Sequence, residues 1–181
     1  MILTGQEICN KHKIGEIYIS PFDNNNINPN SYNFHLGDYL KVYKNNLIDP
    51  KEKQEVEIIN IPDEGIVLFP DKLYLGYTLE TMGSTKYVPI MTGRSSTGRL
   101  GLFVHITADL IDIGSINQWT LQIHVIQPLK VYRNMPIGQV TFWKTVGDIV
   151  LYNGKYQGSE GPMESQIWKD FEENADGRFI L

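Results

Sequence analysis

The sequence predicts a single all-β domain, and three observations lead to that fold class. Short runs of apolar and β-branched residues recur along most of the chain and are bounded by Pro, Gly, Asp or Lys. No long run has the periodicity of an amphipathic helix, and the sequence shows no internal repeat. The 181 residues, 41% hydrophobic and 20% charged, match one globular domain. Many short strands separated by turn residues are typical of a β-sandwich or barrel.

The N-terminal residues predict one short helix. Thr4 and Glu7 have the Thr-x-x-Glu spacing of a capping box, in which the two side chains satisfy free N–H groups of the first turn. Ile8 belongs to an apolar face, and Gly15 would end the helix. Residues 23–30 (Asp-Asn-Asn-Asn-Ile-Asn-Pro-Asn) hold five Asn and one Pro and predict a surface loop.

Nine β segments are expected after this loop. They lie at residues 39–43, 56–61, 65–69, 73–79, 87–91, 102–106, 119–126, 129–132 and 139–143. The last stretch, residues 148–181, is rich in Gly, Glu and Asn and predicts irregular structure. We interpret it either as a flexible C-terminal lid over a site or as a loose terminus, within one domain that spans residues 1–181.

Composition excludes several classes of protein. A net charge of -5 and a pI of about 5.3 argue against a broad basic surface for nucleic acid. The single cysteine, Cys9, allows neither an intrachain disulfide nor a Cys-rich zinc site. No apolar run approaches the roughly 18 residues of a membrane span, and the N-terminus lacks the features of a secretion signal. We therefore expect a cytoplasmic protein that binds neither nucleic acid nor membrane.

The most unusual local sequence is Thr-Gly-Arg-Ser-Ser-Thr-Gly-Arg-Leu-Gly-Leu at residues 92–102. The hydroxyls of Ser95 and Ser96, together with backbone N–H groups, can cradle phosphate oxygens, and Arg94 and Arg99 can add charge-assisted bonds. The spacing is not that of a P-loop. The alternative interpretation is a polar turn with solvated arginines.

Two further segments carry polar side chains suited to a nucleotide. Asp112 lies between apolar residues and a glycine turn, where a carboxylate can hold a sugar hydroxyl or orient a water, or simply cap the turn. Lys155 and Tyr156 lie on a glycine-rich stretch that can close over a polyphosphate, or be a solvated tail. The four histidines show no metal-ligand spacing and are expected to be structural or exposed. They are His12, His35, His105 and His124.

Taken together, these segments resemble the dCTP deaminase family of the dUTPase-like superfamily along nearly the whole chain. Residues 30–38 (Asn-Ser-Tyr-Asn-Phe-His-Leu-Gly-Asp) resemble the family's Ser-x-Asp-x-x-Leu-Gly segment, and residues 93–102 match its Gly-Arg-Ser-Ser-x-x-Arg-Leu-Gly-Leu motif. The other matching segments are residues 1–8, 107–114, 136–139 and 155–165. After the opening residues 1–8, five motifs in order at the family's spacing make the resemblance specific.

The resemblance implies a distorted jelly-roll-like β fold, a homotrimer with sites shared between subunits, and dCTP or dUTP as ligand. Mg²⁺ would be held through the ligand's phosphates, without protein metal ligands and without zinc. The implied catalytic positions are Ser95, Arg99, Asp112 and Gln122. The implied substrate-binding positions are Arg94, Ser96, Thr107, Ala108, Tyr152, Lys155 and Tyr156.

Four residues depart from the family's pattern. Gln122 stands where the deaminases have the glutamate that acts as general base, and an amide cannot titrate. Loss of such a group typically costs about 10²–10⁴-fold in rate. Asn33 replaces an aspartate, Asn117 a glycine, and Ser159 a glutamine of the C-terminal segment.

These departures leave three hypotheses open. The first is a zinc-free dCTP deaminase, a hydrolase that converts dCTP into dUTP and ammonia, with another base; Asp109 is the nearest carboxylate in the sequence. The second is a dUTP diphosphatase in which Asp112 orients the attacking water. The third is a binding protein that has kept the nucleotide pocket and lost catalysis.

Overall fold

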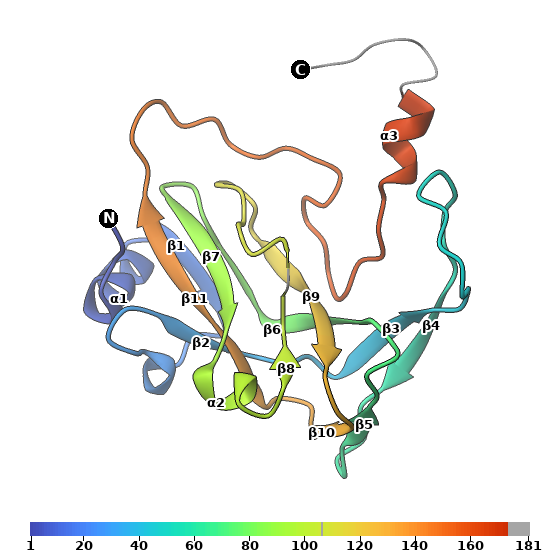
Figure 1. Cartoon of the computed structure of the whole chain (residues 1–181). Coiled ribbons are helices and arrows are strands. Elements are labelled where there is room, and N and C mark those ends of the chain that lie inside the picture. The colour runs from blue at the N-terminus through green and yellow to red at the C-terminus, as the bar shows by residue number, and fades with distance from the viewer. Residues whose placement is uncertain (106, 174–181) are drawn as a thin grey trace.

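Three β-sheets build the fold, so the mainly-β prediction is confirmed (Figure 1). The computed structural model describes residues 1–105 and 107–173. The six-stranded sheet has the order β4-β3-β6-β9-β8, with β1 paired to β6, and the smaller sheets are β2-β11-β7 and β10-β5. The strands are β1 (Ile17–Ser20), β2 (Tyr32–His35), β3 (Tyr39–Tyr43), β4 (Val56–Asn60), β5 (Ile66–Leu68), β6 (Tyr74–Ser84), β7 (Tyr87–Gly93), β8 (Leu102–Phe103), β9 (Asn117–Val125), β10 (Leu129–Val131) and β11 (Pro136–Lys144).

All nine predicted β segments contain a strand, with bounds that shift by a few residues. The segment predicted at 102–106 is the short β8, and its last residue lies outside the described residues. Two strands were not predicted, β1 and β2. Each has four residues, and the polar Asn33 and His35 hide the strand character of β2 although Asn33 is buried.

The helices are α1 (Gly5–Lys13), the 3-10 turn η1 (Asn24–Asn26), α2 (Ser95–Gly98) and α3 (Trp168–Glu173). The predicted N-terminal cap is confirmed on its threonine side, since Thr4 Oγ1 accepts the Glu7 N–H at 3.3 Å. The Glu7 carboxylate instead accepts a bond from Asn10 at 3.2 Å. None of the helices in the described part of the chain is long and apolar enough to cross a membrane.

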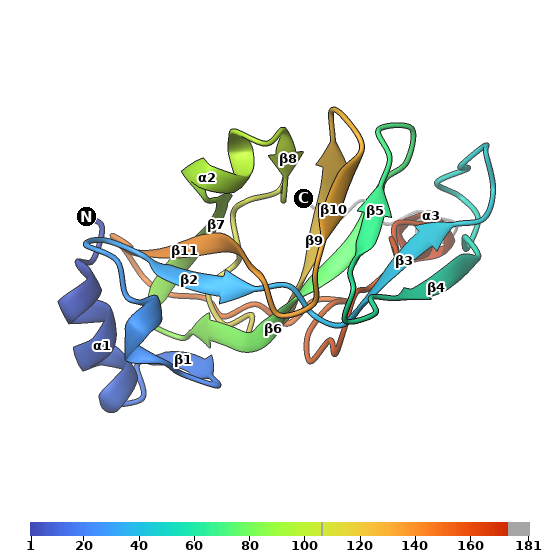
Figure 2. The same ribbon diagram turned by 90° about the horizontal axis from the view of Figure 1, so that it is seen from below.

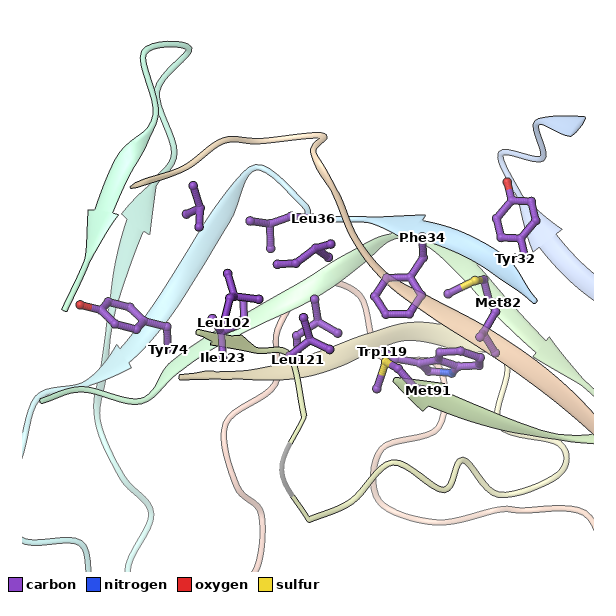
Figure 3. Packing of buried hydrophobic residues seen from close by; sticks show 14 of the residues in the cluster. Tyr32, Phe34, Leu36, Tyr74, Met82, Met91, Leu102, Trp119, Leu121 and Ile123 are labelled. Atoms are coloured by element: carbon purple, nitrogen blue, oxygen red, sulfur yellow. The ribbon is translucent and has the colours of Figure 1, made fainter. Parts of the chain in front are cut away.

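Strand β9 contributes one face to the core, and its opposite face is less buried. Its residues alternate between buried and half-buried along the whole strand, as expected for side chains that point to opposite faces. Trp119, Leu121 and Ile123 point into the core (Figure 3), and each such buried side chain contributes about 1.5–3 kcal/mol. Thr120 and Gln122 therefore lie on the other face.

The C-terminal segment from residue 148 runs past β9 and β3 to α3, as both views show (Figures 1 and 2). It is attached by hydrogen bonds from Met163 N to Thr120 Oγ1 at 2.9 Å and from Ser165 N to the Tyr43 hydroxyl at 3.0 Å. The Lys41–Glu164 ion pair, at 2.9 Å, adds a third attachment. We call residues 148–173 the tail.

Candidate functional site

A cavity of about 490 Å³ lies between β9, the tail and the loop that precedes β9. Its size is that of a small-molecule site. Four of the predicted site residues line it: Asp112, Gln122, Tyr152 and Tyr156. The other lining residues are Tyr43, Leu73, Leu75, His105, Leu110, Ile111, Ser115, Asn117, Trp119, Thr120, Ser159, Met163 and Ser165.

Gln122 is fixed in the middle of the sheet. Its backbone pairs with Leu75 of β6, and its N–H donates to Val104 O at 3.1 Å. Residues that pair across antiparallel strands share a face, so the Gln122 amide stands beside the apolar Leu75 side chain. The uncharged Gln122 amide can thus both donate and accept a hydrogen bond, next to the apolar side chain of Leu75.

Asp112 begins a tight turn at the cavity edge. Ser115 N donates to Asp112 O at 3.0 Å, and Gly114 N donates to Ser84 O at 2.8 Å. Gly114 has φ +95°, and a Cβ there would lie 2.9 Å from Leu151 Cβ, so both the conformation and the space favour glycine. The Asp112 carboxylate is exposed and is the only carboxylate among the described residues that line the cavity.

His105 is a second ionisable side chain that lines the cavity. Burial lowers the pKa of His105 from its ordinary value of 6.5, against the opposing effect of backbone hydrogen bonds at Val104 and Ala108. The imidazole is therefore neutral at pH 7. Within residues 1–105 and 107–173, no group of three or more His, Cys, Asp or Glu side chains is arranged to hold a metal ion.

The tail forms one wall of the cavity. Tyr152 N donates to Ile113 O at 2.8 Å, and the Tyr152 hydroxyl accepts the Tyr156 N–H at 3.2 Å. The Tyr156 hydroxyl in turn accepts the Gln166 N–H at 2.9 Å. The described residues of the tail are thus held in place by hydrogen bonds, whereas a role as a lid stays a prediction.

Lys155 does not line the cavity, although its neighbours do. Its Nζ donates to both carboxylate oxygens of Asp170 at 2.6 Å. Thr107 and Ala108 are exposed and also lie outside the lining. The three residues that the sequence assigns to substrate are therefore not part of this cavity in the single chain.

The predicted phosphate-binding segment lies elsewhere in the chain. Thr97 of α2 donates to Arg94 O and to Ile137 O of β11, and Arg94 Nη1 donates to Pro136 O at 3.3 Å. These bonds anchor α2 to the β2-β11-β7 sheet, away from the tail in both views (Figures 1 and 2). Ser95, Ser96 and Arg99 are exposed.

The sequence motifs therefore form two groups in one chain. Residues 30–38, 93–102 and 136–139 meet around the β2-β11-β7 sheet, where Ser31 Oγ donates to Gln139 Oε1 at 2.8 Å and Gln139 Nε2 donates to Gly93 O at 3.3 Å. Asp112, position 122 and the tail meet at the cavity. Within a single chain, Ser95 and Arg99 do not line the cavity that Asp112 and Gln122 line. The resemblance implies a site shared between subunits, so their joint action stays a prediction. The described residues that line the cavity include neither lysine nor arginine.

Sequence reasoning missed several lining residues. His105 was judged only for metal spacing, although its place next to a predicted strand end was a usable signal. Thr120 and Ser115 lacked any motif of their own. Three of the four departures from the family's pattern, Asn117, Gln122 and Ser159, line the cavity, whereas Asn33 lies in β2 and accepts a bond from Asn28 at 2.9 Å.

Comparisons with known proteins show the family of the chain. The family described as dCTP deaminase-like matches residues 2–145. The chain is 49% identical over 173 residues to a protein of Clostridium beijerinckii named "dCTP deaminase, dUMP-forming", covering 95% of this chain and 99% of the relative. A protein of Clostridium botulinum with the same name is 51% identical over 173 residues, with the same coverage.

A solved structure supports the fold. The chain is similar, with a TM-score of 0.62, to a crystal structure of 2'-deoxycytidine 5'-triphosphate deaminase from Agrobacterium tumefaciens. The sequence identity is 19%, and the match covers 78% of this chain and 47% of that one. At this identity the likeness supports the β architecture alone.

Proposed function

Because the chain belongs to the dCTP deaminase-like family, we propose that it forms dUMP from a pyrimidine deoxynucleoside triphosphate bound in the cavity. The relatives' name gives dCTP as substrate and dUMP as product. From dCTP, one water must displace the amino group, which leaves as ammonia, and a second water must release diphosphate. From dUTP, water releases diphosphate only. We propose that the residues of this chain are better suited to the release of diphosphate from dUTP than to deamination.

One observation carries the proposal: Asp112 is the only carboxylate among the described lining residues. A carboxylate can orient a water and accept its proton as the water attacks phosphorus, a role that contributes about 10²–10⁴-fold. Gln122 is no obstacle to this reaction, because its amide can bind the edge of a pyrimidine as donor and acceptor.

Deamination is the second candidate, and the relatives' name favours it. This reaction needs a group that takes a proton from water and delivers one to the departing amine. Gln122 cannot do so. Asp109, the alternative base that the sequence suggested, is exposed and outside the described lining. Deamination would then depend on another lining group, such as the neutral His105, which does not stand at the position of the family's glutamate. We therefore expect deamination to be the slower reaction.

The phosphates need partners that the cavity's own lining lacks. A triphosphate is usually bound by charge-assisted bonds, and the described lining residues contain no lysine or arginine. Exposed Ser95, Ser96 and Arg99 on α2 of a neighbouring copy fit this need, which supports the homotrimer proposed from the sequence. A solution mass near three times 20.7 kDa is the expected result.

The side chains near the cavity fit Mg²⁺ only if the phosphates of the bound nucleotide supply most of its ligands. Mg²⁺ commonly binds one or two carboxylates together with substrate phosphates, and Asp112 is a single carboxylate. When bound, the ion would neutralise charge on the phosphates. Asp112 orients the water, and Gln122 holds the base.

The experiment is an incubation of purified protein and Mg²⁺ with dCTP or dUTP, with dUTP, dUMP, ammonia and diphosphate resolved. We expect dUMP and diphosphate from dUTP, and a fall of about 10²–10⁴-fold in Asp112→Asn. Asp109→Asn, in the same loop, is the matched control and should keep the wild-type rate. Ammonia from dCTP at the rate of dUMP from dUTP would overturn the preference for diphosphate release. If both nucleotides bind and neither is turned over, the proposed catalytic activity is wrong and the hypothesis of a binding protein remains.

A further inference from the structure

Three neighbouring side chains of β9 hold the tail through its backbone. Asn117 Oδ1 accepts the Gly158 N–H at 2.5 Å, Gln118 Oε1 accepts the Gly161 N–H at 2.8 Å, and Thr120 Oγ1 accepts the Met163 N–H at 2.9 Å. The contacts run in the same order along both segments. The tail is therefore fastened to β9 by side-chain bonds together with one backbone bond, from Gln118 N to Ser159 O at 3.3 Å, and not by a regular strand ladder.

Asn117 differs from the other two because it holds both walls of the cavity. Its side chain is 3% exposed, and its Nδ2 donates to Ser115 Oγ at 2.8 Å. Ser115 closes the turn that begins at Asp112, through the bond from Ser115 N to Asp112 O. One buried amide thus connects the Asp112 turn to Gly158 of the tail.

Two further bonds join the same turn to the tail. Tyr152 N donates to Ile113 O at 2.8 Å, and Gln157 Nε2 donates to Gly114 O at 3.1 Å. Both are made to backbone carbonyls, so substitution of the turn's side chains leaves them in place. Asn117 is buried more deeply than its partner Ser115, and a buried amide that loses a partner costs more than an exposed one.

We infer that Asn117 is a positioning residue that fastens the tail over the cavity before a nucleotide binds, and that ties the tail's position to the Asp112 turn. The role in catalysis rests on the proposed function. The fastening of the tail does not. Tyr152, Tyr156 and Ser159 then stand in place in the free protein, and a ligand binds without the cost of ordering them.

The first test is hydrogen exchange of the ligand-free protein, followed in peptides that cover residues 156–163. Asn117→Ala should raise exchange there about tenfold or more, because the Gly158 N–H loses its acceptor. Asn117→Asp keeps an oxygen for Gly158 N–H and another for the Ser115 hydroxyl, and should restore slow exchange. Asn153→Ala, an exposed asparagine of the same tail, is the matched control. Exchange in Asn117→Ala that equals wild type would overturn the inference.

A second readout separates positioning from general loss of structure. For the dUTP reaction, Asn117→Ala should raise KM about five- to tenfold and change kcat less than twofold, since binding must then order the tail. A fall in kcat with unchanged KM would contradict this. If the protein turns over no nucleotide, the exchange result still decides the inference.

If Asn117→Ala does not fold, Ser115→Ala carries the test. This change removes one of the two Asn117 bonds and leaves Gly158 its partner, so exchange at residues 156–163 should rise by a smaller factor. Peptides from β11 should remain as slow as in wild type. No rise in Ser115→Ala would overturn the role of the Asn117 bridge.

Discussion

Lys155 donates to both carboxylate oxygens of Asp170, and this pair joins the glycine-rich part of the tail to α3. The lysine that the sequence assigns to a triphosphate is thus already paired with an anion of the same chain. A phosphate must replace Asp170 before it can bind Lys155 at full strength.

Asp170→Asn should therefore strengthen nucleotide binding. Exposed ion pairs contribute about 0.2–1 kcal/mol, so we expect KM for dUTP to fall about two- to fivefold. Glu55→Gln is the matched control, because it breaks the exposed Lys44–Glu55 pair, which lies outside the tail, without freeing Lys155. A rise in KM in Asp170→Asn would mean that the pair orders Lys155 for its ligand.

Gln122→Glu should raise the release of ammonia from dCTP. It supplies a titratable group where the described lining offers an amide, and a general base contributes about 10²–10⁴-fold. Gln127→Glu, an exposed amide outside the described lining, is the control and should leave the rate unchanged. An absence of gain would indicate that Asn117 and Ser159 have also changed the shape of the cavity.

The stability of the protein should depend on pH through His105. Burial lowers the pKa of His105 below 6.5 in the folded state. Below the unfolded value the unfolded chain then binds more protons, so the free energy of unfolding falls as the pH drops from about 6.5 through the folded pKa. Above 6.5 the residue adds no pH dependence. Urea unfolding at pH 7.5 and 5.5 should show a smaller loss in His105→Gln than in wild type, and equal losses would refute the assignment.

Gly138→Ala should destabilise the fold. A Cβ at Gly138 would lie 2.1 Å from the ring of Phe34, which is fully buried between the sheets. Overpacking of this kind typically costs about 1–3 kcal/mol. Gly98→Ala is the control, because a Cβ there has nothing within 4 Å. Urea denaturation compares the two, and equal midpoints would show that Phe34 moves aside without cost.

The strands were predictable because alternation and turn residues are local signals. β9 illustrates this, since its inward residues Trp119 and Leu121 are apolar and its outward residues Thr120 and Gln122 are polar. β1 and β2 were missed because four residues give too short a pattern. β2 is held mainly by its pairing with β11, about 100 residues later in the chain, and no local signal reports such a partner.

The site was predicted in part for the same reason. Motifs identified Asp112, Gln122, Tyr152 and Tyr156, all of which line the cavity. They did not reveal that α2 belongs to another sheet, because the bonds of Thr97 and Arg94 to β11 join segments about 40 residues apart. Long-range packing decides which motifs share a cavity.

The attachments of the tail fix the number of residues between 158 and 163 but not the number near residues 146–150. Gly158, Gly161 and Met163 must each reach a fixed side chain of β9, so one residue inserted or deleted between them would shift every later attachment. Residues such as Val146 and Val150, before the attached part, are largely exposed. Insertions and deletions, natural or engineered, should therefore accumulate near residues 146–150 and be rare between 158 and 163. Although residues 158–163 are irregular, they keep a fixed register against β9, as a paired strand does.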